Sequence, residues 1–144
     1  MSYRAGVILL QAEKVALIER HRAGLHYFAF PGGHVDPGET PAQAAVRETM
    51  EELGLRVALY KLIAQYAWHG KWQYYYLAAV TGGVFGSGTG EELHNPLPER
   101  GTYTPMWMPL AELLHQPVLP PQLAELVVRC SKEGWPAEPV ILHE

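Results

Sequence analysis

A sharply bounded amphipathic helix over Pro41–Leu53 sets the strongest limit on the fold of this chain. Thr40 is expected to cap its first turn, because Gln43 completes a Thr-x-x-Gln capping box with it. Gly54 follows and reaches positive φ without strain, so it is expected to end the helix. Small and apolar residues recur at helical spacing and predict one buried stripe, formed by Ala42, Ala45, Val46, Thr49, Met50 and Leu53.

Strand patterns on both sides of this helix predict a mixed sheet. Tyr3–Leu10 and Lys14–Arg20 are apolar-rich segments joined by a short polar turn, which is typical of a hairpin. The other expected elements are strands over Tyr27–Phe30, Leu55–Trp68, Trp72–Thr81 and Tyr103–Met108, a helical turn at Leu110–Leu114, and a helix from Pro120 to about Glu133. Alternating strands and helices indicate an α/β domain whose helices cover the faces of the sheet.

Length and composition predict a single domain over residues 1–144. The chain has 144 residues, 48% of them hydrophobic, and no apolar stretch approaches the ~20 residues that a membrane span needs. Cys130 is the only cysteine, so no internal disulfide can form and a reducing, cytoplasmic location is expected. The formal net charge of −4 argues against a stable nucleic-acid partner, whose binding surface should be basic.

Two longer segments lie outside the predicted helices and strands. Glycines and prolines in Thr81–Thr102 predict a long surface loop, and loops of that length are often functional. The tail Trp135–Glu144 carries several apolar residues, so it is expected to pack either on the domain or on a second subunit.

The predicted helix also gathers three acids, Glu48, Glu51 and Glu52, within an arc of about 100°. Because like charges repel, such a cluster predicts a compensating cation, and oxygen-rich clusters suit Mg²⁺ or Mn²⁺. Gly32 and Gly33 lack side chains, so a backbone carbonyl there can approach the same ion. The spacing alone also fits a solvated helix face, although the helix macrodipole disfavours acids in its C-terminal half.

The residues from Gly33 to Leu55 resemble the Nudix box, written Gly-x5-Glu-x7-Arg-Glu-U-x-Glu-Glu-x-Gly-U, in which U is bulky or aliphatic. Here the fixed positions are filled by Gly33, Glu39, Arg47, Glu48, Glu51, Glu52 and Gly54. Thr49 at the first U position is smaller and more polar than usual, which concerns packing more than catalysis. The later segment Trp107–Leu113 resembles the family's Trp-x-Pro-Leu-x-Glu-Leu element, so the likeness extends over most of the domain.

The resemblance implies a Nudix-type α/β/α sandwich with a mixed sheet, and a hydrolase that cleaves a diphosphate bond with Mg²⁺ or Mn²⁺. It implies that Glu48 and Glu52 are the main metal ligands and that Gly33 adds its carbonyl. Glu51 is implied to be a further ligand or an orienting acid. All three glutamates are therefore candidate catalytic residues, with Glu52 or Glu48 as the general base.

Other residues are expected to support the acidic cluster or to add a further acid to it. Glu39 and Arg47 are implied to be structural, and the spacing lets Arg47 reach Glu51 one turn along the helix. Some Nudix proteins take another acid from a late loop, where Glu91 and Glu92 are the candidates here unless they are solvated loop charges.

Candidate substrate contacts are two arginines and two aromatic pairs, namely Arg20, Arg22, Tyr66, Trp68, Trp72 and Tyr74. The arginines precede an aromatic strand and would meet phosphates, or else belong to a solvated turn. The aromatic side chains would stack on a nucleobase, whereas the alternative is that they form the core side of the sheet.

The leading hypothesis is a Mg²⁺-dependent hydrolase of a diphosphate bond in a nucleoside di- or triphosphate, or in a small molecule linked to a nucleoside diphosphate. One alternative is a house-cleaning pyrophosphatase for oxidised or non-standard nucleoside triphosphates, and another is a non-catalytic nucleotide-sensing module. The partner in each case is a small nucleotide-type molecule, and a homodimer is compatible with the sequence. The family's substrate markers are missing downstream of the box, where the chain has Gly70, Lys71 and Trp72, so the substrate stays open.

Overall fold

The computed structural model describes residues 3–89 and 101–144 as a mixed sheet with two α-helices. The helices are α1 (Pro41–Leu53) and α3 (Pro121–Glu133), and a short 3-10 turn, η2, spans Leu110–Glu112. The strands are β1 (Tyr3–Gln11), β2 (Lys14–Arg22), β3 (Leu25–Ala29), β4 (Gly32–His34), β5 (Leu55–Trp68), β6 (Lys71–Gly83), β7 (Thr102–Pro109), β8 (Val118–Leu119) and β9 (Val140–His143).

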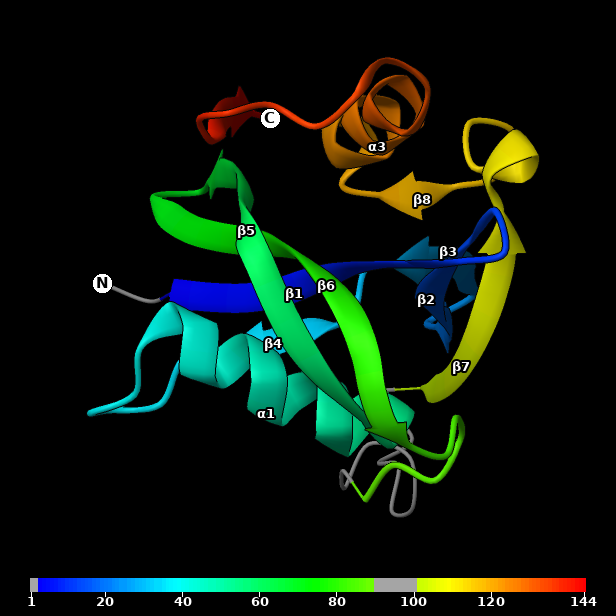
Figure 1. Cartoon of the computed structure of the whole chain (residues 1–144). Coiled ribbons are helices and arrows are strands. Elements are labelled where there is room, and N and C mark those ends of the chain that lie inside the picture. The colour runs from blue at the N-terminus through cyan, green and yellow to red at the C-terminus, as the bar shows by residue number, and fades with distance from the viewer. Residues whose placement is uncertain (1–2, 90–100) are drawn as a thin grey trace.

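The sheet has a central strand, β1, from which the other strands spread in two directions. The strand order is β8-β3-β2-β1-β6-β5-β9, with β4 also pairing β1 and β7 also pairing β2. β1 runs parallel to β6 and antiparallel to β2 and β4. α1 and α3 lie on opposite sides of this sheet (Figure 1), so the fold is the α/β/α sandwich expected from the sequence.

α1 begins and ends as its sequence predicts. The Thr40 hydroxyl accepts a hydrogen bond from the Gln43 amide at 3.1 Å, and the Gln43 side chain accepts one from the Thr40 amide at 2.9 Å. Gly54 ends the helix at φ 77°, a left-handed conformation that glycine adopts without steric cost, and its amide donates to Met50. The bounds Pro41–Leu53 are those expected from the sequence.

The buried face of α1 differs from the predicted stripe. Its buried residues are Ala44, Ala45, Glu48, Thr49, Glu52 and Leu53, whereas Ala42 and Met50 are half-buried. Val46 is 36% exposed, so the prediction that it is buried was wrong. The buried face includes the two glutamates because they lie against the β4 glycines: the Gly32 amide donates to Glu52, and Gly33 approaches the Glu48 carboxylate closely. Thr49 is fully buried and donates its hydroxyl hydrogen to the Ala45 carbonyl at 2.7 Å, so this polar side chain is satisfied within the apolar face.

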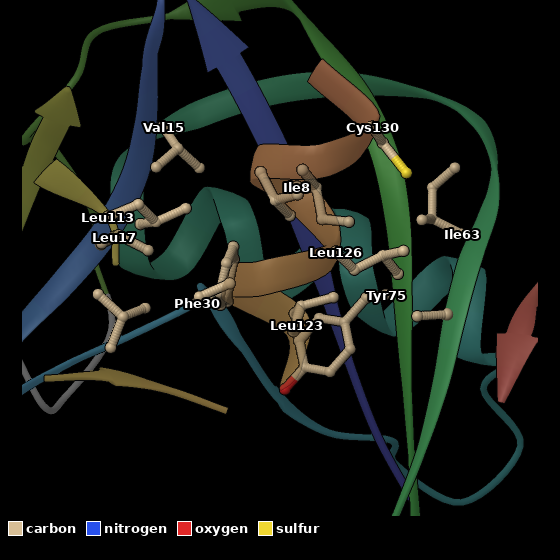
Figure 2. Close-up of a cluster of buried hydrophobic side chains, with 14 of the residues drawn as sticks. Ile8, Val15, Leu17, Phe30, Ile63, Tyr75, Leu113, Leu123, Leu126 and Cys130 are labelled. Atoms are coloured by element: carbon tan, nitrogen blue, oxygen red, sulfur yellow. The ribbon is translucent and has the colours of Figure 1, made fainter. Parts of the chain in front are cut away.

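Each helix covers its own apolar core. Under α1, the buried side chains are Ala5, Val7, Leu9, Ala16, Ile18, Ala44, Ala45, Leu53, Leu55, Val57 and Ala78. On the other face, α3 brings Leu123, Leu126 and Cys130 against Ile8 and Ile63 of the strands, as Figure 2 shows. Odd positions of β2 belong to the α3 core and even positions to the α1 core, which is the alternation of a strand buried on both faces.

Three strands were missing from the sequence prediction because they are short. β4 and β8 have three and two residues, too few to show a period-two pattern. β9 forms in the tail and pairs in parallel with β5, from Ala64 opposite Val140 to Ala67 opposite His143. The tail thus packs on the domain itself, one of the two expected outcomes. Within the described ranges, neither helix has the length and apolar character needed to cross a membrane.

Candidate active site

Two carboxylates of α1 meet the glycine backbone of β4. Glu48 and Glu52 lie on successive turns and are only 8% and 7% exposed. The Gly32 amide donates to Glu52 Oε1 at 2.7 Å. A side chain on Gly33 would overlap the Glu48 carboxylate, so glycine is required for this close approach. The pairing of β4 with β1 fixes these glycines, because Gly33 lies opposite Ala5 and Gly32 opposite Gly6.

Arg47 ties the loop before α1 to the helix itself. Its Nε and Nη2 donate to the two carboxylate oxygens of Glu39 at 2.8 and 2.9 Å, a bidentate pair. Its Nη1 lies 3.0 Å from Glu48 Oε1 and 3.1 Å from Glu51 Oε2, and its Nη2 donates to the His34 carbonyl at 2.9 Å. The hydrogen bond from Arg47 lowers the pKa of Glu39 to about 2, and the bond to Glu39 is the main reason that the pKa of Arg47 is raised. Arg47 therefore holds α1, β4 and the preceding loop in one arrangement.

A cavity of about 680 Å³ opens beside Glu48 and Glu52, and Gly32 and Gly33 also line it. Four cationic side chains contribute to its walls, namely Arg4, Arg20, Arg22 and Lys71. Aromatic side chains line it as well, namely Tyr27, Phe30, Tyr66, Trp68, Tyr75 and Tyr103. A concave site with carboxylates, cations and aromatic faces is suited to a ligand that carries both a charged group and a flat ring.

Arg20 is held inside this cavity by its neighbours. Its guanidinium carbon lies 3.6 Å from the centroid of the Tyr103 ring and 5.7 Å from that of Tyr27. Its Nε also donates to the Thr102 carbonyl at 3.1 Å. The contacts arise from strand register, because Arg20 of β2 pairs with Tyr27 of β3 on one side and Tyr103 of β7 on the other. The result is a cation with a fixed orientation between two aromatic rings.

The structure places the aromatic residues expected on β5 and β6 differently relative to the cavity. Tyr66 and Trp68 line the cavity, but Trp72 and Tyr74 are not among its lining residues. Successive side chains of β6 alternate between faces, and Tyr74 packs on the α1 core with its ring 6.1 Å from that of Tyr3. Tyr75, one position further, faces the cavity instead and donates its hydroxyl hydrogen to Gln73 at 2.6 Å. Its burial raises the pKa of the Tyr75 hydroxyl.

The remaining expected site residues are placed as follows. Glu51 is not a lining residue, since its carboxylate turns to Arg47. Glu91 and Glu92 lie outside the described residues. Arg20 and Arg22 both line the cavity.

Several lining residues carry no local sequence pattern that marks them as part of a site. Arg4, Lys71 and Tyr103 reach the cavity through strand pairing and the β5–β6 turn, which no local pattern reveals. His34 belongs to β4 and lines the cavity, and burial together with the nearby Arg4 and Lys71 lowers its pKa.

The donor set at this end of the cavity fits a small divalent cation. Glu48 and Glu52 supply carboxylate oxygens, and the close approach of the Gly33 backbone leaves no side chain between it and Glu48. Hard oxygen donors of this kind are preferred by Mg²⁺ and Mn²⁺. Two nearly buried carboxylates on one helix face also favour a positive charge beside them, and Arg47 forms an ion pair with Glu48 at 3.0 Å.

Comparisons with known proteins identify relatives of this chain. A protein of Bacillus subtilis (strain 168) named putative 8-oxo-dGTP diphosphatase is 36% identical over 80 residues, which make up 54% of this chain and 52% of that protein. An RNA pyrophosphohydrolase of Yersinia enterocolitica is 39% identical over 59 residues, 41% of this chain and 33% of that protein. The chain thus spans about half or less of the length of the curated relatives it matches.

Solved structures share the fold. A NUDIX hydrolase from Nitrosomonas europaea superposes with a TM-score of 0.74 at 21% identity, over 99% of this chain and 79% of the other. An ADP-ribose pyrophosphatase from Streptococcus suis 89-1591 superposes with a TM-score of 0.69 at 18% identity, over 99% and 98% of the two chains. The family model described as the NUDIX domain matches residues 2–130, nearly the whole chain. This chain belongs to the NUDIX domain family.

Proposed function

We propose that this protein hydrolyses a diphosphate bond in a nucleoside di- or triphosphate, or in a small molecule linked to a nucleoside diphosphate, with Mg²⁺ or Mn²⁺. The observation that carries the proposal is the junction of α1 and β4. There Glu48 and Glu52 are buried against Gly32 and Gly33 at one end of a cavity that cationic side chains line. Family membership supports the reaction class, and the names of the relatives support a nucleotide-type substrate.

Glu48, Glu52 and the Gly33 carbonyl would hold the divalent ion, whereas Glu51 would act through its contact with Arg47 as an orienting acid. When bound, the ion would neutralise diphosphate oxygens and lower the pKa of an attacking water. The protein's own part is to fix the acids. Arg47 holds Glu48, and the Gly32 amide holds one oxygen of Glu52.

Proton transfer from the water would fall to a carboxylate of the same cluster. Glu52 or Glu48 would take the proton as general base while the water oxygen bonds to phosphorus and the bridging P–O bond breaks. Arg4, Arg20, Arg22 and Lys71 would neutralise phosphate oxygens that the ion does not reach. Tyr66 and Trp68 would offer ring faces to the nucleobase.

The test is a panel of nucleoside triphosphates and nucleoside diphosphate conjugates incubated with the untagged protein and Mg²⁺ or Mn²⁺. Products are identified by mass spectrometry in water enriched in heavy oxygen, which reveals the phosphorus that is attacked. We expect a metal-dependent diphosphate cleavage of at least one panel member, and its loss in Glu52→Gln. An intact panel with either metal would overturn the proposal.

One relative favours a narrower version of this function. The Bacillus subtilis protein carries the name putative 8-oxo-dGTP diphosphatase, so we propose house-cleaning of oxidised or non-standard nucleoside triphosphates as the second candidate. A higher kcat/KM for the oxidised than for the ordinary nucleotide would support it. Tight binding of nucleotides without any product would instead indicate the non-catalytic sensing module.

A further inference from the structure

A second cluster of ligand-type side chains lies on the hairpin of β2 and β3. Glu19, His21 and His26 each offer one carboxylate oxygen or ring nitrogen, and these atoms lie within 4.8 Å of one another. His26 Nε2 is 2.7 Å from Glu19 Oε2, and His21 Nε2 is 3.6 Å from the same oxygen. The two imidazole rings stack face to face, 4.2 Å apart and within 3° of parallel.

Strand register brings these three groups together. His21 and His26 are directly opposed across the β2–β3 ladder, and Glu19 lies two residues before His21 on the same face of β2. Opposed residues on neighbouring strands have their Cβ atoms only about 5 Å apart, so the backbone pairing places the two imidazoles next to each other.

This cluster is separate from the cavity beside Glu48 and Glu52. Arg20 and Arg22 line that cavity, whereas Glu19 and His21 alternate with them and point to the opposite face of the strand. None of the three cluster residues lines the cavity. Any ligand of the cluster therefore leaves the proposed diphosphate site accessible.

We propose that Glu19, His21 and His26 form a binding site for a zinc-class transition-metal ion. In tetrahedral zinc sites the metal–nitrogen and metal–oxygen bonds are about 2.0–2.2 Å, so neighbouring ligand atoms are about 3.3 Å apart. The two distances to Glu19, 2.7 and 3.6 Å, lie on either side of that spacing. To bind one ion, both imidazoles must rotate out of their parallel stack so that their ring planes converge on it, and their exposure leaves room for this, since 57% and 46% of their side-chain surface is accessible.

The donor chemistry separates this site from the one on α1. Two imidazoles and one carboxylate favour Zn²⁺ over Mg²⁺, which prefers oxygen donors alone. Zn²⁺ would take the place of the hydrogen that His26 and Glu19 share across 2.7 Å. With three protein ligands, a fourth position stays open to water. The bound ion would clip β2 to β3 and so hold Arg20 and Arg22 on the reverse face of the same strand.

The experiment is calorimetric titration of the untagged protein with Zn²⁺ in a Mg²⁺ concentration that saturates oxygen-only sites. We expect one zinc site per chain, weakened at least about tenfold by His21→Ala or His26→Ala. The matched control is His69→Ala, because His69 and Glu144 form another exposed pair, 3.5 Å apart, with one imidazole only. The control should bind zinc as the wild type does.

A measurement on the wild-type protein removes any dependence on the folding of the variants. Substoichiometric Zn²⁺ should shift or broaden the imidazole proton resonances of His21 and His26 and leave those of His69 and His115 unchanged. Equal zinc affinity in wild type, His21→Ala and His26→Ala would overturn the proposal, as would zinc that perturbs other histidines first. Neither result would bear on diphosphate hydrolysis, which is assayed with Mg²⁺ alone.

Discussion

At the scale of single residues, the three acids of α1 differ in what holds them. Glu52 accepts the Gly32 amide hydrogen, Glu48 contacts Arg47 and the Gly33 backbone, and Glu51 contacts Arg47 from outside the cavity. These contacts predict different consequences when each carboxylate is replaced by an isosteric amide. The difference matters because sequence spacing alone treats the three as equivalent.

We predict that Glu52→Gln and Glu48→Gln each lower kcat about 10²- to 10⁴-fold, because in the proposed function each would remove a metal ligand or the general base. Glu51→Gln should cost less, about 10- to 100-fold, because it acts through Arg47. Steady-state kinetics on the best substrate of the panel measures all three. Glu133→Gln on the exposed end of α3 is the control and should be neutral. Near-full turnover in Glu52→Gln would exclude Glu52 as the base.

Gly33 gives a second prediction at this scale. In Gly33→Ala the new methyl group would overlap the Glu48 carboxylate, so activity should be lost and the free energy of unfolding should fall by about 1–3 kcal/mol. Activity assays and urea unfolding measure the two effects. Gly82→Ala is the control, because its methyl group would meet only the mobile end of Arg56. Wild-type activity in Gly33→Ala would show that β4 does not need its close approach to the helix.

At the scale of elements, the ion pair between Arg47 and Glu39 is one of the contacts that hold the loop before α1. Arg47 holds the pKa of Glu39 at about 2, below its ordinary value of 4.5, so Glu39 binds protons more weakly in the folded chain. The pair therefore stabilises the fold fully above pH 4.5, and this stabilisation disappears as the pH falls toward 2.

We predict that Glu39→Gln lowers the urea midpoint at pH 7 and that its difference from wild type shrinks as the pH falls from about 4.5 toward 2. Urea unfolding at a series of pH values, followed by circular dichroism, measures the difference. Glu112→Gln on the exposed η2 turn serves as a control. A midpoint difference that stays constant across this range would contradict the assigned pair.

An element is predicted well from the sequence when the signals that define it are local, and less well when it depends on contacts with residues distant in sequence. α1 was predicted to the residue because its cap, its proline and its terminal glycine are local signals. Its buried face was predicted less well, since Val46 is exposed and Glu48 is buried against the Gly33 backbone of β4, which is distant in sequence. For the same reason Tyr75, and not Tyr74, lines the cavity: alternation gives two faces but does not say which one faces the ligand.

At the scale of the whole molecule, the tail completes the sheet. β9 pairs with β5, and Trp135, Val140 and Leu142 pack against the α3 core, while the intervening Ile141 is 49% exposed. Leu142 and Ile141 are therefore neighbouring apolar residues of β9 that differ in burial, so each can serve as the control for the other. A homodimer stays a prediction, and analytical ultracentrifugation of the wild type and of variants at these two positions would test it.

We predict that Leu142→Ala lowers the free energy of unfolding by about 1–2 kcal/mol, because it removes a partly buried side chain. Ile141→Ala should cost little if the protein is a monomer, since its side chain meets solvent. Urea unfolding of both variants measures the difference. A larger loss in Ile141→Ala, together with dissociation of a dimer, would indicate that this edge is a subunit interface.

The cavity described above draws its acids from one helix and its arginines and rings from neighbouring strands. In the proposed function, the residues that would cleave the substrate and those that would select it therefore come from separate segments of the chain. Substitutions at Arg20, Tyr66 or Trp68 should change the substrate preference and leave the acidic residues of α1 in place. A library of variants confined to β2 and β5 would test this separation. Evolution could change substrate preference by the same route.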